Sequence, residues 1–238
     1  MTSKGLVDST EMYLRTIFEL EEEGVVPLRA RIAERVRHSG PTVSQTVARM
    51  QRDGLVRVAE DRRLVMTEPG RRRATRVMRK HRLAECLLAD VIGLRWEDVH
   101  VEASRWQHVI SDAVESRLTE VLGHPAMCPH GSPIPTGVEW DTGPASVLTL
   151  TDAATTAERA VTAVRVLRIG ELLQNEPSAL LRLKHAGIRP GHHVTAVATG
   201  SGVRVTGAQQ ATIPHRLSDH VFVEFPGDVR VRQGDQAR

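Results

Sequence analysis

Histidine and carboxylate side chains recur at helical spacing between residues 81 and 108 of this chain. His81 and Glu85 are four residues apart, so on a helix they share a face and can bind one cation. His100 and His108 would also share a face, but at 1.5 Å per residue they lie about 12 Å apart, too far for one ion. The spacing therefore predicts two cation sites or none. The alternative is that His81 and Glu85 form only a salt bridge, as a single His–Glu pair on a helix surface usually does.

A Cys-Pro-His sequence, Cys128 to His130, offers a second pair of metal-ligating side chains. With no matching pair nearby it is a weak zinc motif, and an ordered structural loop is the better interpretation. The chain has no nucleophile elbow, no glycine-rich phosphate loop and no His-Glu-x-x-His motif. We therefore expect no enzyme; a metal-dependent hydrolase built on the His/Glu cluster would lack a general base and a nucleophile.

Two short amphipathic segments, residues 28–36 and 41–53, are joined by a glycine-containing turn. On the second segment Val43, Val47 and Met50 would face inward, and Ser39 is placed to cap its first turn. This is the layout of a helix-turn-helix, whose second helix lies in the DNA major groove. The alternative is a solvated helix on a helical bundle. We expect DNA contacts from these residues: Arg29, Arg31, Ser39, Pro41, Thr42, Ser44, Gln45 and Arg49.

Charge is unevenly distributed along the 238 residues, although the net charge is only +3. Residues 1–80 carry 17 Lys and Arg against 11 Asp and Glu, which favours a polyanion partner. Residues 81–150 carry 4 against 10, which favours cations. No membrane span or signal pattern is visible, and two cysteines give no disulfide framework, so we expect a cytoplasmic protein.

Hydrophobic periodicity predicts an α+β protein. A helix over 7–23 precedes the paired helices, and strands over 55–58 and 64–66 add a wing. Helices are expected over 71–92, 96–109 and 112–122, followed by an ordered turn cluster over 124–135. Residues 136–158 are weakly patterned and are expected to form a linker. Beyond them a small β-barrel is expected, with strands over 161–169, 193–198, 203–205 and 221–225 and a helix over 179–186.

Four stretches of the chain resemble the diphtheria toxin repressor family of iron-dependent regulators. They are residues 6–17, 39–52, 78–85 and Ile134-Pro135, and the resemblance is dense over 5–135 and looser over 160–225. It implies a winged helix-turn-helix over 1–73, a helical dimerisation and metal-binding domain over 74–136, a flexible linker over 137–158, an SH3-like domain over 159–226 and a tail over 227–238. It also implies a homodimeric repressor of iron-uptake and siderophore genes that binds operator DNA when ferrous iron is bound.

The resemblance also implies two metal sites. The ancillary site would use His81, Glu85, His100, Glu171 and Gln174, and it is intact. The primary, activating site would use Met12, Ser104, Gln107 and His108, and here the sequence departs from the family. Iron-dependent members have Cys in place of Ser104 and Glu in place of Gln107, whereas manganese-type members have Glu at both positions.

The departure removes charge from the primary site. A thioether, a hydroxyl, an amide and an imidazole are all neutral, so most of the attraction for a divalent ion is lost. Either this site is weak, or Glu11 or Glu102 reorients to help, or another effector has replaced iron. Ferrous iron is the expected cofactor, with Mn²⁺, Co²⁺, Ni²⁺ and Zn²⁺ as further ligands in vitro. The alternative is the same scaffold acting constitutively or on a different effector.

Overall fold

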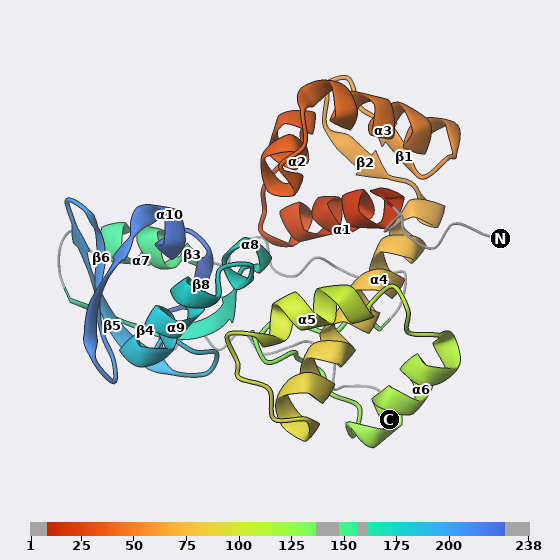
Figure 1. Cartoon of the computed structure of the whole chain (residues 1–238). Coiled ribbons are helices and arrows are strands. Elements are labelled where there is room, and N and C mark those ends of the chain that lie inside the picture. The colour runs from red at the N-terminus through yellow and green to blue at the C-terminus, as the bar shows by residue number, and fades with distance from the viewer. Residues whose placement is uncertain (1–8, 137–147, 157–160, 227–238) are drawn as a thin grey trace, which may run out of the picture. The chain divides into compact units, whose positions relative to one another are not determined.

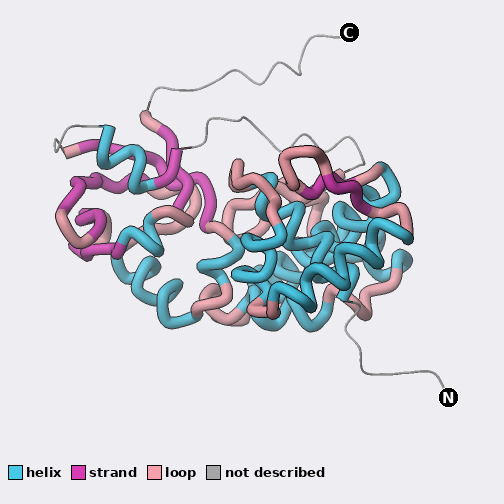
Figure 2. The backbone as a smooth tube through the Cα atoms, turned by 90° about the horizontal axis from the view of Figure 1, so that it is seen from above, coloured by secondary structure: helices cyan, strands magenta, loops and turns pink. Residues whose placement is uncertain are grey.

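The computed structural model describes residues 9–136, 148–156 and 161–226. The chain divides into two compact units, residues 1–145 and 146–238, which are described separately below. Figure 2 shows that the first unit is mostly helix and that the second contains most of the strands. None of the described helices is long and apolar enough to span a membrane.

The first unit begins with a winged helix-turn-helix. Its helices are α1 (Ser9–Glu22), α2 (Arg29–Val36) and α3 (Gly40–Arg52), and its wing is the antiparallel pair β1 (Val56–Val58) and β2 (Leu64–Met66) (Figure 1). The predicted helices and strands are confirmed; the first part of the helix expected from Val7 lies outside the described residues.

The core of this winged domain explains why the paired helices fold as they do. Val43, Val47 and Met50 on α3 are fully buried against α1, whose Tyr13 and Ile17 are also fully buried. Burying each such side chain stabilises the fold by roughly 1.5–3 kcal/mol. The Ser39 hydroxyl accepts from the Thr42 N–H at 3.4 Å and so caps α3, as predicted.

A long helix, α4 (Glu68–Cys86), leads out of the wing and continues into a π-helical turn over Leu87–Val91. It begins three residues before the predicted start because the Thr67 hydroxyl caps it by accepting from Gly70 N–H at 3.3 Å. A Cβ atom on Gly70 would lie 1.9 Å from the Leu55 carbonyl oxygen. Only glycine therefore permits this approach of α4 to the wing.

Two shorter helices pack on α4, namely α5 (Val99–Trp106) and α6 (Asp112–Val121), both within the predicted ranges (Figure 1). The turn cluster over 124–135 follows, closed by a bridge between Met127 and Pro133. Its Ile134 packs with Leu83, Cys86 and Cys128. This segment is thus ordered, as expected.

The second unit is built on a six-stranded antiparallel sheet in the order β3-β8-β4-β5-β6-β7. The strands are β3 (Leu148–Thr149), β4 (Thr162–Ile169), β5 (His193–Thr199), β6 (Gly202–Thr206), β7 (Gln210–Pro214) and β8 (Val221–Glu224). The helices are α7 (Leu150–Thr156), α8 (Glu171–Gln174), α9 (Pro177–Ala186) and α10 (His215–Ser218). The four predicted strands and the predicted helix are confirmed.

The predicted linker over 137–158 is wrong for its described part, residues 148–156. Leu148 and Thr149 pair with Val223 and Phe222 of β8, and Leu150, Ala153 and Ala154 of α7 are fully buried. This segment is rich in Thr and Ala, so its hydrophobic pattern is too weak to predict a buried helix. It is buried because it packs on the sheet, which the local sequence does not show. Strand β7 was also not predicted, since Gln210 and Thr212 leave only Ile213 as a strong apolar residue.

Candidate metal centre and nucleic-acid interface

His81, Glu85 and His100 converge in the interior of the first unit, and we call these three the ancillary cluster. Glu85 Oε1 lies 3.1 Å from His81 Nε2 and 3.1 Å from His100 Nδ1, and the two imidazole nitrogens are 3.2 Å apart. All three side chains are fully buried. The i, i+4 spacing on α4 places the first two together, and α5 supplies the third.

Two residues of the turn cluster join the same carboxylate. His130 Nδ1 lies 3.3 Å from Glu85 Oε1, and Glu85, Cys128 and His130 each offer a ligand atom within 4.8 Å of the others. For Cys128 and His130 the sequence favoured a structural loop over a weak zinc motif. The turn is structural, yet its close packing on α4 also brings both side chains to Glu85, which no local pattern could reveal.

Burial sets the ionisation of the cluster. Desolvation, with the positive charge of Arg15 nearby, lowers the pKa of His81 to about 4, so its imidazole is neutral at pH 7. Burial alone would raise the pKa of Glu85, but its contacts with His81, His130 and His100 hold that pKa well below its usual range. The cluster therefore contains an anionic carboxylate at Glu85 and a neutral imidazole at His81, the charge states in which these two side chains bind a metal ion.

The donor atoms of the cluster fit a divalent cation. Glu85 Oε2 and His130 Nε2 are buried without a hydrogen bond to any described residue, and His130 Nδ1 has only its 3.3 Å ion-pair approach to Glu85 Oε1. Leaving such polar atoms unpaired is costly, and a bound cation would satisfy them. Imidazole, carboxylate and thiol together suit a transition-metal ion better than Mg²⁺ or Ca²⁺.

The predicted primary site differs from the ancillary cluster, because two of its residues bind the guanidinium of Arg15. Arg15 Nη1 donates to Ser104 Oγ at 3.2 Å and to Gln107 Oε1 at 3.0 Å. Arg15 Nη2 lies 3.3 Å from His100 Nε2, and Arg15 Nε donates to Glu19 at 2.5 Å. The arginine is buried. Ser104 and Gln107 thus bind a cationic side chain of this chain itself.

The remaining primary-site residues are engaged elsewhere. His108 Nδ1 lies 2.8 Å from Glu11 Oε2, and Gln107 Nε2 lies 3.0 Å from His108 Nε2. Met12 packs against the core of the winged helix. Of the two carboxylates expected to help, Glu11 does reach His108, whereas Glu102 pairs with Arg105 and Trp106. A set of neutral donors already holding a guanidinium does not fit a divalent cation.

Glu171 and Gln174 lie at the two ends of α8 in the second unit. Gln174 Nε2 donates to the Ile169 carbonyl at 2.7 Å, within the same unit. Their assignment to the ancillary site stays a prediction.

The expected DNA-reading residues lie together on the exposed face of α3. Pro41, Thr42, Ser44 and Gln45 are all exposed, and they occupy the first two turns of the helix. Ser39 and Thr42 share a 2.8 Å hydrogen bond between their hydroxyls. The N-terminal part of α3 therefore offers hydroxyl and amide groups to a partner, as base-edge recognition requires.

The three predicted arginines occupy distinct environments. Arg31 is exposed and lies 3.7 Å from Glu34, and Arg29 has a buried Nε without a hydrogen-bond partner in the described part of the chain. Arg49 donates to the Ser9 hydroxyl at 2.6 Å, linking α3 to the start of α1. Arg49 therefore has a structural contact that sequence reasoning did not anticipate.

Five large apolar side chains between residues 91 and 121 are exposed. They belong to the π-helical turn, to α6 and to the residue after His108, and they are Val91, Ile92, Val109, Val114 and Val121. Val109 is 80% exposed. Exposed apolar side chains of this size are candidates for a surface that a partner covers.

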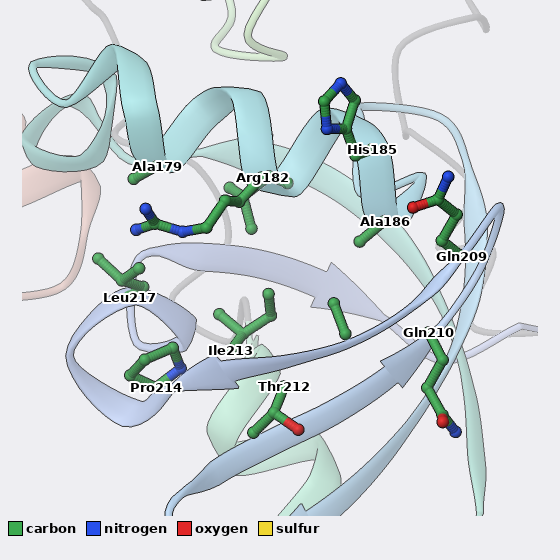
Figure 3. A pocket seen from close by; sticks show the side chains of 12 residues that line it. Ala179, Arg182, His185, Ala186, Gln209, Gln210, Thr212, Ile213, Pro214 and Leu217 are labelled. Atoms are coloured by element: carbon green, nitrogen blue, oxygen red, sulfur yellow. The ribbon is translucent and has the colours of Figure 1, made fainter.

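The second unit has a cavity of about 200 Å³ between α9 and β7. Figure 3 shows Arg182 and His185 on the helix, above Thr212, Ile213 and Pro214 of the strand. No described cluster of metal-ligating side chains lies there.

Comparison with known proteins identifies both parts of the first unit. Residues 5–64 match the family described as "Iron dependent repressor, N-terminal DNA binding domain", and residues 67–136 match "Iron dependent repressor, metal binding and dimerisation domain". The chain is 54% identical over 228 residues to the iron-dependent repressor IdeR of Mycobacterium tuberculosis, covering 92% of this chain and 98% of the relative. It is 57% identical over 198 residues to the diphtheria toxin repressor of Corynebacterium diphtheriae, covering 82% and 86%.

Solved structures resemble the fold as well. A manganese-dependent transcriptional repressor in complex with manganese superposes with a TM-score of 0.74 at 27% identity, covering 90% of this chain and 98% of the other. IdeR of T. acidophilum gives 0.71 at 25% identity, covering 94% and 100%. The two family matches together span more than half of this chain.

Proposed function

Since this chain belongs to the iron-dependent repressor family, we propose that it is a metal-responsive repressor that binds operator DNA as a homodimer. The observation that carries the proposal is the course of α4. This helix begins against the wing at Gly70 and carries His81 and Glu85 of the buried ancillary cluster. One rigid element thus joins the metal-ligating residues to the DNA-binding domain.

On the DNA side, α3 enters the major groove. Pro41, Thr42, Ser44 and Gln45 contact base edges, with Gln45 suited to adenine and the small side chains suited to thymine methyl groups. Arg29 and Arg31 contact phosphates, which fixes the position of the helix on the duplex. Ser39 orients the first turn as its cap, and Arg49 braces α3 against α1.

On the effector side, His81, Glu85 and His100 hold the metal ion, with Glu171 and Gln174 as further ligands and Cys128 and His130 as neighbouring donors. The ion supplies a positive charge beside the Glu85 carboxylate and takes up the lone pair of a neighbouring imidazole nitrogen, and Glu85 Oε2 and His130 Nε2 have no hydrogen bond to any described residue. Ferrous iron is the physiological metal, by analogy with the named relatives. The genes repressed are those for metal uptake and siderophores, and the protein acts in the cytoplasm.

A homodimer follows from the same premise. A two-fold symmetric repressor reads two half-sites of one operator, and the valine-rich surface of Val91, Ile92, Val109, Val114 and Val121 supplies an interface. A monomer at micromolar concentration, with and without metal, would contradict this part of the proposal.

A second candidate function has its own supporting observation. The primary set is Met12, Ser104, Gln107 and His108. Because Arg15 binds two of its members, Ser104 and Gln107, the metal switch at that set is weak, and the protein represses constitutively or answers to another effector. Under this alternative the scaffold is retained but operator binding no longer depends on iron.

One experiment separates the two. The operator is first selected from random duplexes by repeated rounds of binding, and fluorescence anisotropy then measures its affinity with Fe²⁺ under anaerobic conditions, with Mn²⁺, with Zn²⁺ and with a chelator. The leading proposal requires tighter binding with at least one metal and loss of that gain in His81→Ala. Equal binding with chelator supports the constitutive alternative, and no selectable DNA at all would overturn both.

A further inference from the structure

Arg15 sits at the crossing of α1 and α5 and contacts both sets of predicted metal ligands. Its guanidinium donates to Ser104 and Gln107 of the primary set and reaches His100 of the ancillary cluster. Both α1 and α5 pack against α4, the helix that carries His81 and Glu85 (Figure 1). A buried arginine in this position is a fixed positive charge beside residues that the family resemblance assigns to a cation site.

The neighbours of Arg15 fit a guanidinium well. Hydroxyl and amide oxygens accept hydrogen bonds from arginine without needing a negative charge of their own, and Glu19 neutralises the arginine at 2.5 Å. With Glu at 107 and a thiolate at 104, the same space would hold two more negative charges. The neutral side chains of Ser104 and Gln107 therefore suit a site in which the buried Arg15 already supplies the positive charge.

Hydrogen-bond polarity then fixes the tautomer of His100. Arginine carries donors only, so His100 Nε2 must accept from Arg15. A neutral imidazole has one donor and one acceptor nitrogen, so His100 Nδ1 carries the proton and donates to Glu85 Oε1 at 3.1 Å.

The same logic extends along a chain of side chains to α1. Gln107 accepts from Arg15 through Oε1, so its Nε2 donates to His108 Nε2, and His108 Nδ1 donates to Glu11. A continuous run of hydrogen bonds thus connects Glu85 in the ancillary cluster to Glu11 on the N-terminal helix, and Arg15 at its middle donates in both directions, through Nη2 to His100 and through Nη1 to Gln107. A movement of the Arg15 side chain would therefore disturb the hydrogen bonds on both of its sides.

We propose that Arg15 is a resident cation of the primary site and couples the ancillary cluster to α1 by holding His100 in a tautomer that cannot bind metal. This inference rests on the function proposed above. It explains how binding of metal at the ancillary cluster would affect the N-terminal helix. The nitrogen of His100 that faces Glu85 and His81 is Nδ1, and it can ligate a cation only without its proton. The proton then resides on Nε2, the charge of the ring is unchanged, and Nε2–H faces the donors of Arg15.

Metal occupancy of the ancillary cluster is consequently incompatible with the Arg15–His100 contact. Arg15 Nη2 must leave His100, and because the guanidinium is one rigid group we expect its bonds to Ser104, Gln107 and Glu19 to shift with it. The primary site of this chain therefore transmits the signal through an arginine that moves, and holds no second ion.

Metal affinity without DNA tests the coupling. Mn²⁺ is titrated into metal-free protein against a competing fluorescent chelator. Arg15→Gln should bind on the order of tenfold more tightly, because it removes a buried positive charge beside a ligand. Arg105→Gln removes the same charge from exposed α5 surface, where Arg105 pairs with Glu102, and should bind as the parent does. Should Arg15→Gln fold poorly, Arg15→Gln with Glu19→Gln removes the buried pair together.

A second measurement reads the tautomer directly. Long-range ¹H–¹⁵N spectra of histidine rings distinguish a protonated ring nitrogen from an unprotonated one. In metal-free parent protein His100 should carry its proton on Nδ1, and in the Zn²⁺-loaded protein on Nε2.

The outcomes separate this inference from the proposed function. Unchanged or weaker Mn²⁺ affinity in Arg15→Gln, or a metal-free His100 protonated on Nε2, overturns the role of Arg15 and leaves the repressor proposal standing. A parent protein that binds none of Mn²⁺, Zn²⁺ and Fe²⁺ refutes the metal-responsive proposal, while the metal-free tautomer still decides whether Arg15 controls His100.

Discussion

Arg82 and Glu22 form a buried, doubly hydrogen-bonded ion pair between α4 and α1. Arg82 Nη1 and Nη2 donate to the two carboxylate oxygens at 2.9 and 2.6 Å, and the Arg82 side chain is fully buried. Arg82 Nη1 also donates to the Pro133 carbonyl at 2.7 Å. A single residue, directly after His81, thus connects the winged helix, the long helix and the turn cluster.

Removing one partner of this pair should destabilise the first unit strongly. Glu22→Gln leaves the buried Arg82 without its counter-charge, and we expect a loss of about 3–5 kcal/mol in the free energy of unfolding. Urea denaturation followed by circular dichroism measures it. The matched control is Glu120→Gln, which breaks the exposed pair with Arg117 and should cost about 0–1 kcal/mol. Equal losses in the two variants would show that the buried pair has no special role.

Gly70→Ala should also destabilise the protein, for a steric reason. The new Cβ would lie 1.9 Å from the Leu55 carbonyl oxygen, so α4 must move away from the wing. Overpacking of this kind costs roughly 1–3 kcal/mol. Gly40→Ala is the control, because no atom lies within 4 Å of its Cβ position, and its unfolding free energy should change little. If both variants unfold at the parent's midpoint, the predicted contact between α4 and the wing is wrong.

Gln45 and Arg31 should affect DNA binding in different ways. Gln45→Ala removes a base-edge contact and should weaken operator binding by about 1–3 kcal/mol while leaving random-DNA affinity unchanged. Arg31→Ala should weaken both affinities and reduce the salt dependence of each. Anisotropy titrations with the two duplexes at several salt concentrations make the comparison. An equal loss on both duplexes for Gln45→Ala would argue against base reading.

Cys86 should resist alkylation in the folded protein. Burial, together with the nearby charges of Glu85 and Asp90, raises the pKa of its thiol to about 12. At pH 8 the reactive thiolate is then only about one part in ten thousand. Iodoacetamide at pH 8, followed by peptide mass mapping, should label Cys86 in urea but barely in native protein. Fast labelling of the native state would contradict this burial.

The sequence was most informative where a local pattern decides the structure. The apolar spacing of α3, its Ser39 cap and the alternating strands of the sheet could be read directly, because each depends on near neighbours in the chain. Helix α7 could not, since Ala153 and Ala154 are apolar only weakly and are buried by distant strands.

The candidate site divides in the same way. His81 and Glu85 were predictable from helical spacing, whereas the approach of His130 depends on how the turn cluster packs. Arg15 gave no signal at all, because an arginine on an amphipathic helix is usually solvated. Only the tertiary contacts with Ser104, Gln107 and His100 reveal its role.

Restoring negative charge at the primary site should create a second metal site. Ser104→Cys with Gln107→Glu adds up to two negative charges beside His108, which in a partly buried site contributes roughly several kcal/mol toward a divalent ion. Glu at 107 would also lose the amide hydrogen bond to His108 Nε2 and free that nitrogen as a ligand. We therefore expect one more Mn²⁺ per chain than the parent holds after desalting, measured by atomic emission, together with stronger metal-dependent operator binding.

Arg15 limits this gain, because its guanidinium would pair with the new carboxylate at the position where it now contacts Gln107 Oε1 at 3.0 Å. Adding Arg15→Gln to the double variant should tighten the second site further, whereas adding Arg105→Gln should not. A parent that already retains two ions per chain and binds its operator tightly only with Fe²⁺ would show that neutral donors suffice. In that case the Arg15 side chain would have to move away from Ser104 and Gln107 when the metal binds, even in the unsubstituted protein.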